Sequence, residues 1–151
     1  MGRASGVIGR PCDEEQVFKR SSFLNTELTK EIRMEIPGPL DRALICARTA
    51  NENKAKDILI LDMRKITPLY DYFVISTGAS RRQIHSIAED IDDRMKKVGD
   101  KRIGLEGYEA SRWVVQDYGD VVVHIFDKDA RFYFSLEELW ADAARIDWKQ
   151  D

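Results

Sequence analysis

Two strand-like runs adjoin between residues 111 and 126, in the stretch SRWVVQDYGDVVVHIF. Val, Ile, Trp, Tyr and Phe dominate both runs, which is typical of half-buried strands. Gly119-Asp120 separates the runs and supplies a two-residue turn, because Gly adopts positive φ without strain. We therefore predict a β-hairpin in which Trp113 lies opposite Phe126.

The two faces of this hairpin differ in polarity. The more apolar face is predicted to pack against helices and carries Val114, Gln116, Tyr118, Val121, Val123 and Ile125. The other face carries Trp113, Val115, Asp117, Val122, His124 and Phe126. Because this second face mixes a large aromatic side chain with polar groups, we expect it to suit a partner better than a core. A register slip of one residue would exchange the two faces.

Apolar residues at helical spacing predict three helices. The first covers 40–51, and its stripe is Leu40, Ala43, Leu44 and Ala47. The second begins at a capping box formed by Ser80 and Gln83 and ends at Gly99. The third follows Asp127-Lys128-Asp129, and one side of it is lined by Phe132, Leu136, Leu139, Trp140 and Ala143. We interpret this aromatic stripe as core, since such spacing lets a helix dock on a sheet.

Two apolar runs, 57–64 and 72–77, predict further strands, and 101–110 reads as an irregular connection. The order of elements predicts an α/β fold: a single domain with a mixed four- to five-stranded sheet and helices packed mainly on one side, which leaves part of the other face open. Residues 1–38 are interpreted as a flexible extension, 39–146 as the domain and 147–151 as a tail. Within the extension, the apolar spacing leaves a short helix over 22–36 open.

Composition narrows the classes of partner and compartment. A formal charge of −3 and a pI near 5.5 argue against direct nucleic-acid binding as the main contact and favour a basic protein partner. No apolar run is long enough to cross a bilayer, so no membrane association is expected. Cys12 and Cys46 form no disulfide framework, which favours a reducing, cytoplasmic location, and Cys46 is interpreted as a packing thiol.

One enzyme hypothesis remains open beside a binding function. Thr77-Gly78-Ala79-Ser80 at a strand-to-helix junction offers backbone donors for an anion, and Asp127 and Asp129 could hold a metal. A nucleotidyl- or phosphoryl-transfer enzyme would need a third carboxylate on a nearby strand, which is missing here, so a polar turn is preferred. We expect no cofactor and no metal. His85 is interpreted as a solvated residue and His124 as a sheet-surface histidine able to tune binding near neutral pH.

Three blocks of the sequence resemble the signature blocks of the ribosomal silencing factor family, also called the Iojap family. They are DYFVISTGASRRQ, GYEASRWVVQDYGDVVVHIF and RFYFSLEELW, and the resemblance covers about residues 40–145. It implies an α/β domain related in fold to nucleotidyltransferases but without their catalytic carboxylates. It also implies a non-enzymatic translational repressor that binds the fourteenth protein of the large ribosomal subunit and blocks joining of the small subunit.

The resemblance places Trp113, Asp117 and Tyr118 at this contact, and the predicted partner-binding set as a whole is Trp113, Val115, Asp117, Tyr118 and His124. An exposed Trp beside an Asp would offer a basic partner an apolar anchor and an acceptor. Burying one Trp removes about 150–250 Å² from water, a gross gain of ~4–6 kcal/mol before association costs. An open apolar sheet face would also allow a weak homodimer.

Overall fold

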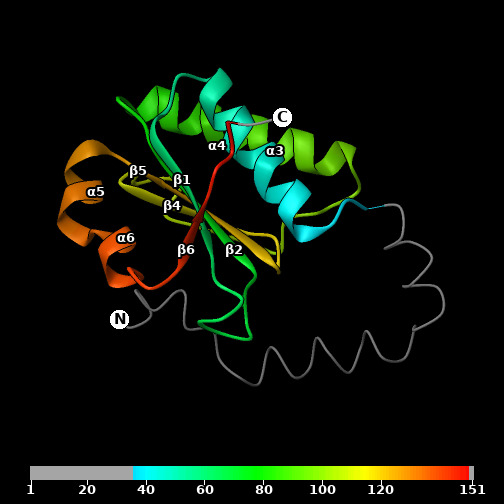
Figure 1. Ribbon diagram of the computed structural model, residues 1–151. Helices are drawn as coiled ribbons and strands as arrows, with labels where there is room; N and C mark the ends of the chain where they lie inside the picture. Colours follow the sequence, from blue (N-terminus) through cyan, green and yellow to red (C-terminus); the bar gives the residue numbers. More distant parts are fainter. Residues whose placement is uncertain (1–35, 150–151) are drawn as a thin grey trace. The chain divides into compact units, whose positions relative to one another are not determined.

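The computed structural model describes residues 36–149, which form layers of helix, sheet and helix (Figure 1). The flexible extension predicted over 1–38 and the short helix over 22–36 lie outside the described residues, except for residues 36–38. Among the described residues, no helix is long and apolar enough to span a bilayer.

One mixed six-stranded sheet organises the domain, in the order β3-β4-β5-β2-β1-β6. The strands are β1 (Lys56–Asp62), β2 (Tyr72–Thr77), β3 (Gly104–Glu106), β4 (Trp113–Asp117), β5 (Val121–Phe126) and β6 (Ala144–Ile146). β2 and β5 pair in parallel at the centre, and every other pair is antiparallel. The mixed sheet is as predicted, but it has six strands rather than four to five. The two missed strands, β3 and β6, are edge strands of three residues each, too short to show an alternating pattern.

The predicted hairpin and its register are confirmed. β4 pairs with β5 so that Trp113 lies opposite Phe126 and Val115 opposite His124. Gly119 has φ of 91°, the left-handed conformation that the two-residue turn requires. Register was readable from sequence because a short turn determines which residues face each other.

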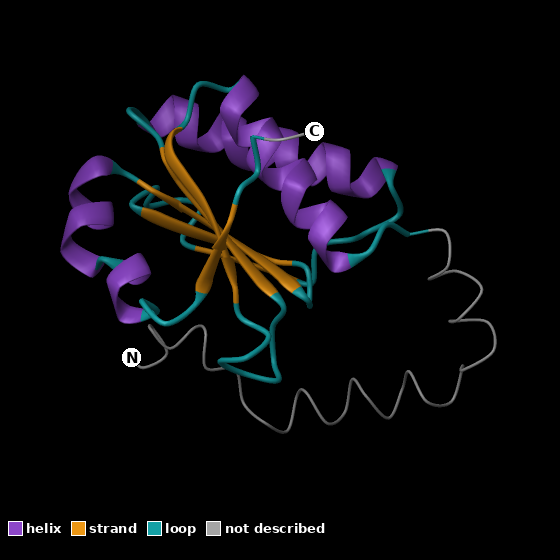
Figure 2. Cartoon of the chain, in the orientation of Figure 1, coloured by secondary structure: helices purple, strands orange, loops and turns teal. Residues whose placement is uncertain are grey.

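The two long helices cover the face of the sheet predicted to be the core face (Figure 2). α3 (Pro39–Glu52) presents small residues to the sheet, and α4 (Arg81–Lys97) presents Ile84, Ile87 and Ile91. As predicted, Ser80 caps α4, its hydroxyl accepting from the Gln83 N–H at 3.1 Å. The buried Cys46 of α3 is the predicted packing thiol, and burial raises its pKa.

The prediction of a single final helix is wrong. The chain forms two short helices, α5 (Lys128–Phe134) and α6 (Leu136–Leu139), before it enters β6. Ser135 lies between them in the left-handed region, with φ of 43°. Since this turn redirects the chain, the helical spacing of the aromatic stripe no longer describes one face. Phe132 and Leu139, expected in the core, are instead 86% and 67% exposed.

Candidate protein-docking surface

α5 and α6 lie over the second face of the hairpin, the face that carries Trp113 (Figure 2). The Trp113 ring packs between Phe126 beneath it and Phe134 of α5, with ring centroids 5.1 and 4.7 Å away. Tyr133 meets Phe134 edge to face at 5.0 Å. The face expected to stay partly open is therefore covered here by an aromatic cluster that continues from the sheet out to the surface.

α5 and α6 expose several large apolar side chains near this cluster. Phe132 is 86% exposed, Tyr133 78%, Leu139 67% and Phe134 43%, while Trp113, in contact with Phe134, is half-buried. We name the set of Trp113, Phe132, Tyr133, Phe134 and Leu139 the aromatic surface. Large exposed apolar side chains gathered on neighbouring short elements are typical of protein-docking sites, where aromatic residues provide most of the binding energy.

The inner side of α5 explains why these aromatic residues point outward. Asp127 caps the helix, its carboxylate accepting from the Ala130 N–H at 2.7 Å. Ala130 is fully buried, and Arg131 is 8% exposed. The Arg131 guanidinium donates to Thr77 Oγ1 of β2 at 2.8 Å and to both carboxylate oxygens of Glu137 at 3.1 and 3.2 Å. Since Ala130 and Arg131 hold α5 to the sheet, Phe132 and Tyr133 face solvent, whereas Phe134, one turn after Ala130 and Arg131, packs on Trp113.

Below the aromatic surface, His124 supports the indole of Trp113. Trp113 Nε1 donates a hydrogen bond to His124 Nδ1 at 3.1 Å, and the imidazole is fully buried. Burial lowers the pKa of His124 to about 3, so the ring is neutral at physiological pH. The interpretation of His124 as a sheet-surface histidine that titrates near neutral pH is therefore wrong. Phe73, edge-on at 4.7 Å, closes the other side of the ring.

The five residues predicted to bind a partner fall into three environments. Trp113 belongs to the aromatic surface, with Val115 and His124 buried on the same face of the sheet. Tyr118 is buried on the opposite face, and Asp117, half-buried at the turn, accepts from the Gly119 N–H at 2.8 Å. Partner binding by these five residues stays a prediction. Because Val115, Tyr118 and His124 are buried, they cannot contact a partner directly. They can affect binding only through the exposed residues that they support.

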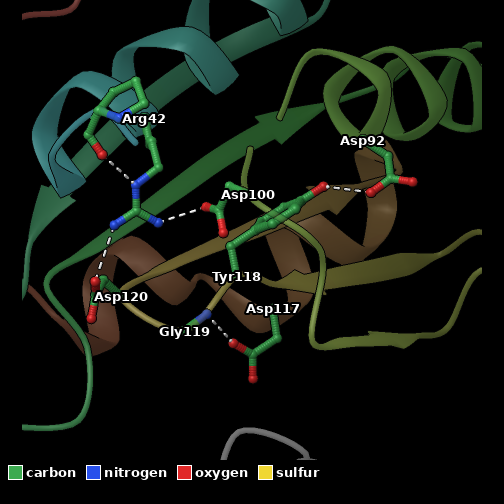
Figure 3. A network of polar contacts seen from close by, with 8 residues as sticks. Arg42, Asp92, Asp100, Asp117, Tyr118, Gly119 and Asp120 are labelled. Carbon is green, nitrogen blue, oxygen red and sulfur yellow. Dashed lines mark hydrogen bonds and ion pairs between the residues drawn. The ribbon is translucent and has the colours of Figure 1, made fainter. Parts of the chain in front are cut away.

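The Asp-Tyr-Gly-Asp segment at the hairpin turn fastens the sheet to the helices (Figure 3). Tyr118 donates to Asp92 of α4 at 3.2 Å. Asp120 and Asp100 both accept from the guanidinium of Arg42 in α3, at 3.0 and 2.6 Å. Burial raises the pKa of the Asp100 carboxyl, while the hydrogen bond from Arg42 acts against that rise. These contacts give Tyr118 and Asp120 structural roles in the fold.

The residues proposed for an enzyme are engaged in packing and capping. Gly78 N–H donates to the Phe126 carbonyl at 2.8 Å and Ala79 N–H to the Gln83 side-chain oxygen at 2.5 Å, so these donors at the junction already have acceptors. A Cβ on Gly78 would lie 2.6 Å from Cγ1 of Ile84, so close packing against Ile84 explains why a glycine occupies this position. Asp127 caps α5, and no group of three or more potential metal ligands occurs within residues 36–149.

Comparison with known proteins identifies the family. The family model described as "Ribosomal silencing factor during starvation" matches residues 37–151. The chain belongs to the ribosomal silencing factor family. A Bacillus subtilis protein named "Ribosomal silencing factor RsfS" is 45% identical over 103 residues, which cover 68% of this chain and 87% of that protein. The sequence-based assignment to the family is therefore confirmed.

Two further relatives of this chain extend the comparison. A crystal structure of a Chromobacterium violaceum protein superposes with a TM-score of 0.68 at 30% identity, covering 76% of this chain and 95% of that one. A mouse protein named "Mitochondrial assembly of ribosomal large subunit protein 1" is 29% identical over 114 residues, 69% of this chain and 50% of that protein. The matched family range, 37–151, contains the whole aromatic surface.

Sequence reasoning missed four of the five residues of the aromatic surface. The signal that could have found them is the run Phe132-Tyr133-Phe134, because one helix cannot turn three consecutive residues toward the same sheet.

His85 also differs from its interpretation as a solvated residue. Its ring stacks on Tyr108 with centroids 4.0 Å apart, and Nε2 lies 2.7 Å from Ser111 Oγ.

Proposed function

We propose that this protein acts as a ribosomal silencing factor that docks on the large ribosomal subunit through the aromatic surface, contacts the fourteenth protein of that subunit, and thereby prevents the small subunit from joining. The observation that carries the proposal is the exposure of Phe132, Tyr133 and Leu139 on α5 and α6. Family membership supports a role in ribosome silencing, and the name of the mouse relative links such proteins to the large subunit.

The size of the aromatic surface suits a specific but reversible contact. Covering its exposed apolar parts would remove on the order of 500 Å² from water, since each large aromatic side chain carries about 150–250 Å². At roughly 25 cal/mol per Å², the gross gain is ~12 kcal/mol. Association costs about 4–15 kcal/mol, which is of the same order as this gain, so polar contacts at the rim of the aromatic surface must contribute.

The charge around the aromatic surface favours a basic partner. Between residues 127 and 142 the chain carries five acidic side chains and only two basic ones. Ribosomal proteins are commonly basic because they neutralise RNA phosphates, so attraction would speed the encounter and orient it. Rim charges of this kind act mainly on the association rate, and the buried aromatic residues on the dissociation rate.

Steric exclusion requires no chemistry from the bound factor. A domain seated on the surface that the small subunit must also cover prevents joining for as long as it stays bound. Translation is then repressed in proportion to the fraction of large subunits occupied. The proposed location is the cytoplasm. The weak homodimer stays a prediction, and a dimer formed through the same aromatic residues would compete with docking.

A matched pair of surface variants tests this function. Phe132→Ser and Leu139→Ser together remove exposed apolar groups from the aromatic surface and leave its buried supports in place. We expect at least tenfold weaker binding to purified large subunits, and loss of comigration with them in a sucrose gradient. Ile103→Ser is the control. Ile103 is also exposed, at 51%, but its backbone N–H donates to the Asp117 carbonyl, at the end of β4 away from Trp113.

Subunit joining, followed by light scattering, provides the functional readout. Wild type and Ile103→Ser should inhibit joining equally, whereas the Phe132→Ser, Leu139→Ser protein should not. A folded double variant that still blocks joining at wild-type concentrations would exclude the aromatic surface as the docking site. Joined ribosomes that retain the wild-type factor would exclude steric blocking itself.

A further inference from the structure

A buried histidine beneath a docking surface needs a reason, because an apolar side chain would fill the same space without a polar group to satisfy. His124 is fully buried on β5, diagonal to Trp113 across the β4–β5 pair. Its Nδ1 accepts the hydrogen bond from Trp113 Nε1 at 3.1 Å. Trp113 is in turn the half-buried member of the aromatic surface, where α5 meets the sheet.

The direction of this hydrogen bond defines the protonation of the imidazole. The indole N–H can only donate, so Nδ1 must be unprotonated and the hydrogen of the neutral ring lies on Nε2. His124 Nε2 is buried and has no partner among the described residues. Phe73, edge-on at 4.7 Å, and Phe126, nearly parallel at 6.4 Å, fix the plane of the ring. The imidazole is thus a neutral acceptor in a fixed orientation.

We propose that His124 is a positioning residue that holds the Trp113 indole in the orientation needed for docking, an inference that rests on the proposed function. The other ring contacts of the indole, with Phe126 and Phe134, are apolar and constrain its orientation less specifically than a hydrogen bond does. The hydrogen bond is directional and selects one rotamer before the partner arrives. A preorganised anchor loses less side-chain entropy on binding.

This arrangement also determines how a partner recognises Trp113. The indole N–H is already engaged with His124, so Trp113 has no hydrogen-bond donor left for the partner. The contact from the large subunit is therefore made to the ring carbons of Trp113. A partner that required the indole N–H would have to break the bond to a buried acceptor, which would leave a neutral imidazole nitrogen unsatisfied.

Binding of full-length variants to purified large subunits tests the inference. His124→Leu removes the acceptor and keeps similar volume, and Trp113→Phe removes the donor and keeps a ring. We expect each to weaken binding roughly fivefold, the usual effect of one hydrogen bond. His124→Asn, whose amide oxygen can accept from the indole, should recover part of the loss. Val122→Ala is the control, because it truncates a buried residue on the same strand and face without touching the hydrogen bond.

The double variant His124→Leu, Trp113→Phe separates positioning from general destabilisation. If the histidine acts through the indole N–H, the double variant binds no more weakly than either single variant. Two independent losses, multiplying to roughly 25-fold, would overturn the inference. So would wild-type binding by His124→Leu, or a loss in Val122→Ala as large as that in His124→Leu.

A measurement without the ribosome keeps this inference distinct from the proposed function. In the wild-type chain, NMR should show the Trp113 Nε1–H protected from exchange and scalar-coupled to His124 Nδ1. An indole N–H that exchanges as fast as a free one would overturn the positioning role, even if the chain binds large subunits. A protected, coupled N–H in a chain that does not bind large subunits would instead refute the proposed function alone.

Discussion

Acidification should destabilise this domain through His124. The folded state holds the pKa of His124 at about 3 because burial disfavours the charged ring, whereas in the unfolded chain it returns to about 6.5. Below pH 6.5 the imidazole of the unfolded chain therefore binds a proton, whereas the imidazole in the folded state stays unprotonated until the pH approaches 3. The contribution of neutral His124 to the free energy of unfolding is fully present above pH 6.5, and it is lost progressively as the pH falls toward 3.

The size of this effect follows from the difference between the two pKa values. Each pKa unit is worth about 1.4 kcal/mol, so the full difference corresponds to roughly 5 kcal/mol, reached near pH 3. Between pH 7.5 and pH 5 the expected loss is about 2 kcal/mol. Domains of this size have a free energy of unfolding of about 5–15 kcal/mol, so the loss is readily measured.

Two carboxyl groups act in the opposite direction and need a control. Burial raises the pKa of Asp71 and of Asp100, so each stabilises the folded state as the pH falls. Urea unfolding of wild type and His124→Asn at several pH values separates the contributions, because only the imidazole is removed. The difference in unfolding free energy between the two proteins should shrink by about 2 kcal/mol from pH 7.5 to pH 5.

Parallel pH profiles for the two proteins would refute the assignment of this effect to His124. Should His124→Asn fail to fold, the wild-type protein still decides the question. NMR titration of the His124 ring protons should show no protonation above pH 4 while the protein remains folded. A ring that titrates near pH 6 in the folded state would contradict the burial argument.

Three substitutions test the contacts that hold the hairpin. Gly107→Ala should lower the free energy of unfolding by about 3 kcal/mol or more, since φ is +76° and a Cβ would lie 2.1 Å from the Trp113 carbonyl oxygen; an unchanged midpoint in urea would contradict this. Arg42→Met should cost ~2–3 kcal/mol in thermal unfolding, because Asp100 and Asp120 lose their shared cation; equal stability would show that the pair is merely tolerated. Tyr118→Phe should cost ~1 kcal/mol, measured calorimetrically, through the lost hydrogen bond to Asp92, and no loss would mean that water replaces it.

Local signals in the sequence were sufficient for the elements that define their own geometry. The start of α4 was readable at Ser80, because capping depends on residues within one turn. The hairpin register was readable from Gly119-Asp120, since a two-residue turn leaves one way to pair the strands. The end of the chain was not readable, because the left-handed Ser135 breaks a spacing that a straight helix would have kept.

By itself, the sequence determined the two long helices, the hairpin and the fact that its two faces differ. Tertiary structure decided that the second face of the hairpin is covered as well. α5 and α6 fold back over Trp113 through Arg131, a contact with Thr77 that lies 54 residues away in the chain. This fold-back buries His124 and exposes Phe132. The physical reason is that alternation along a strand specifies opposite faces, whereas burial depends on long-range packing that no local pattern encodes.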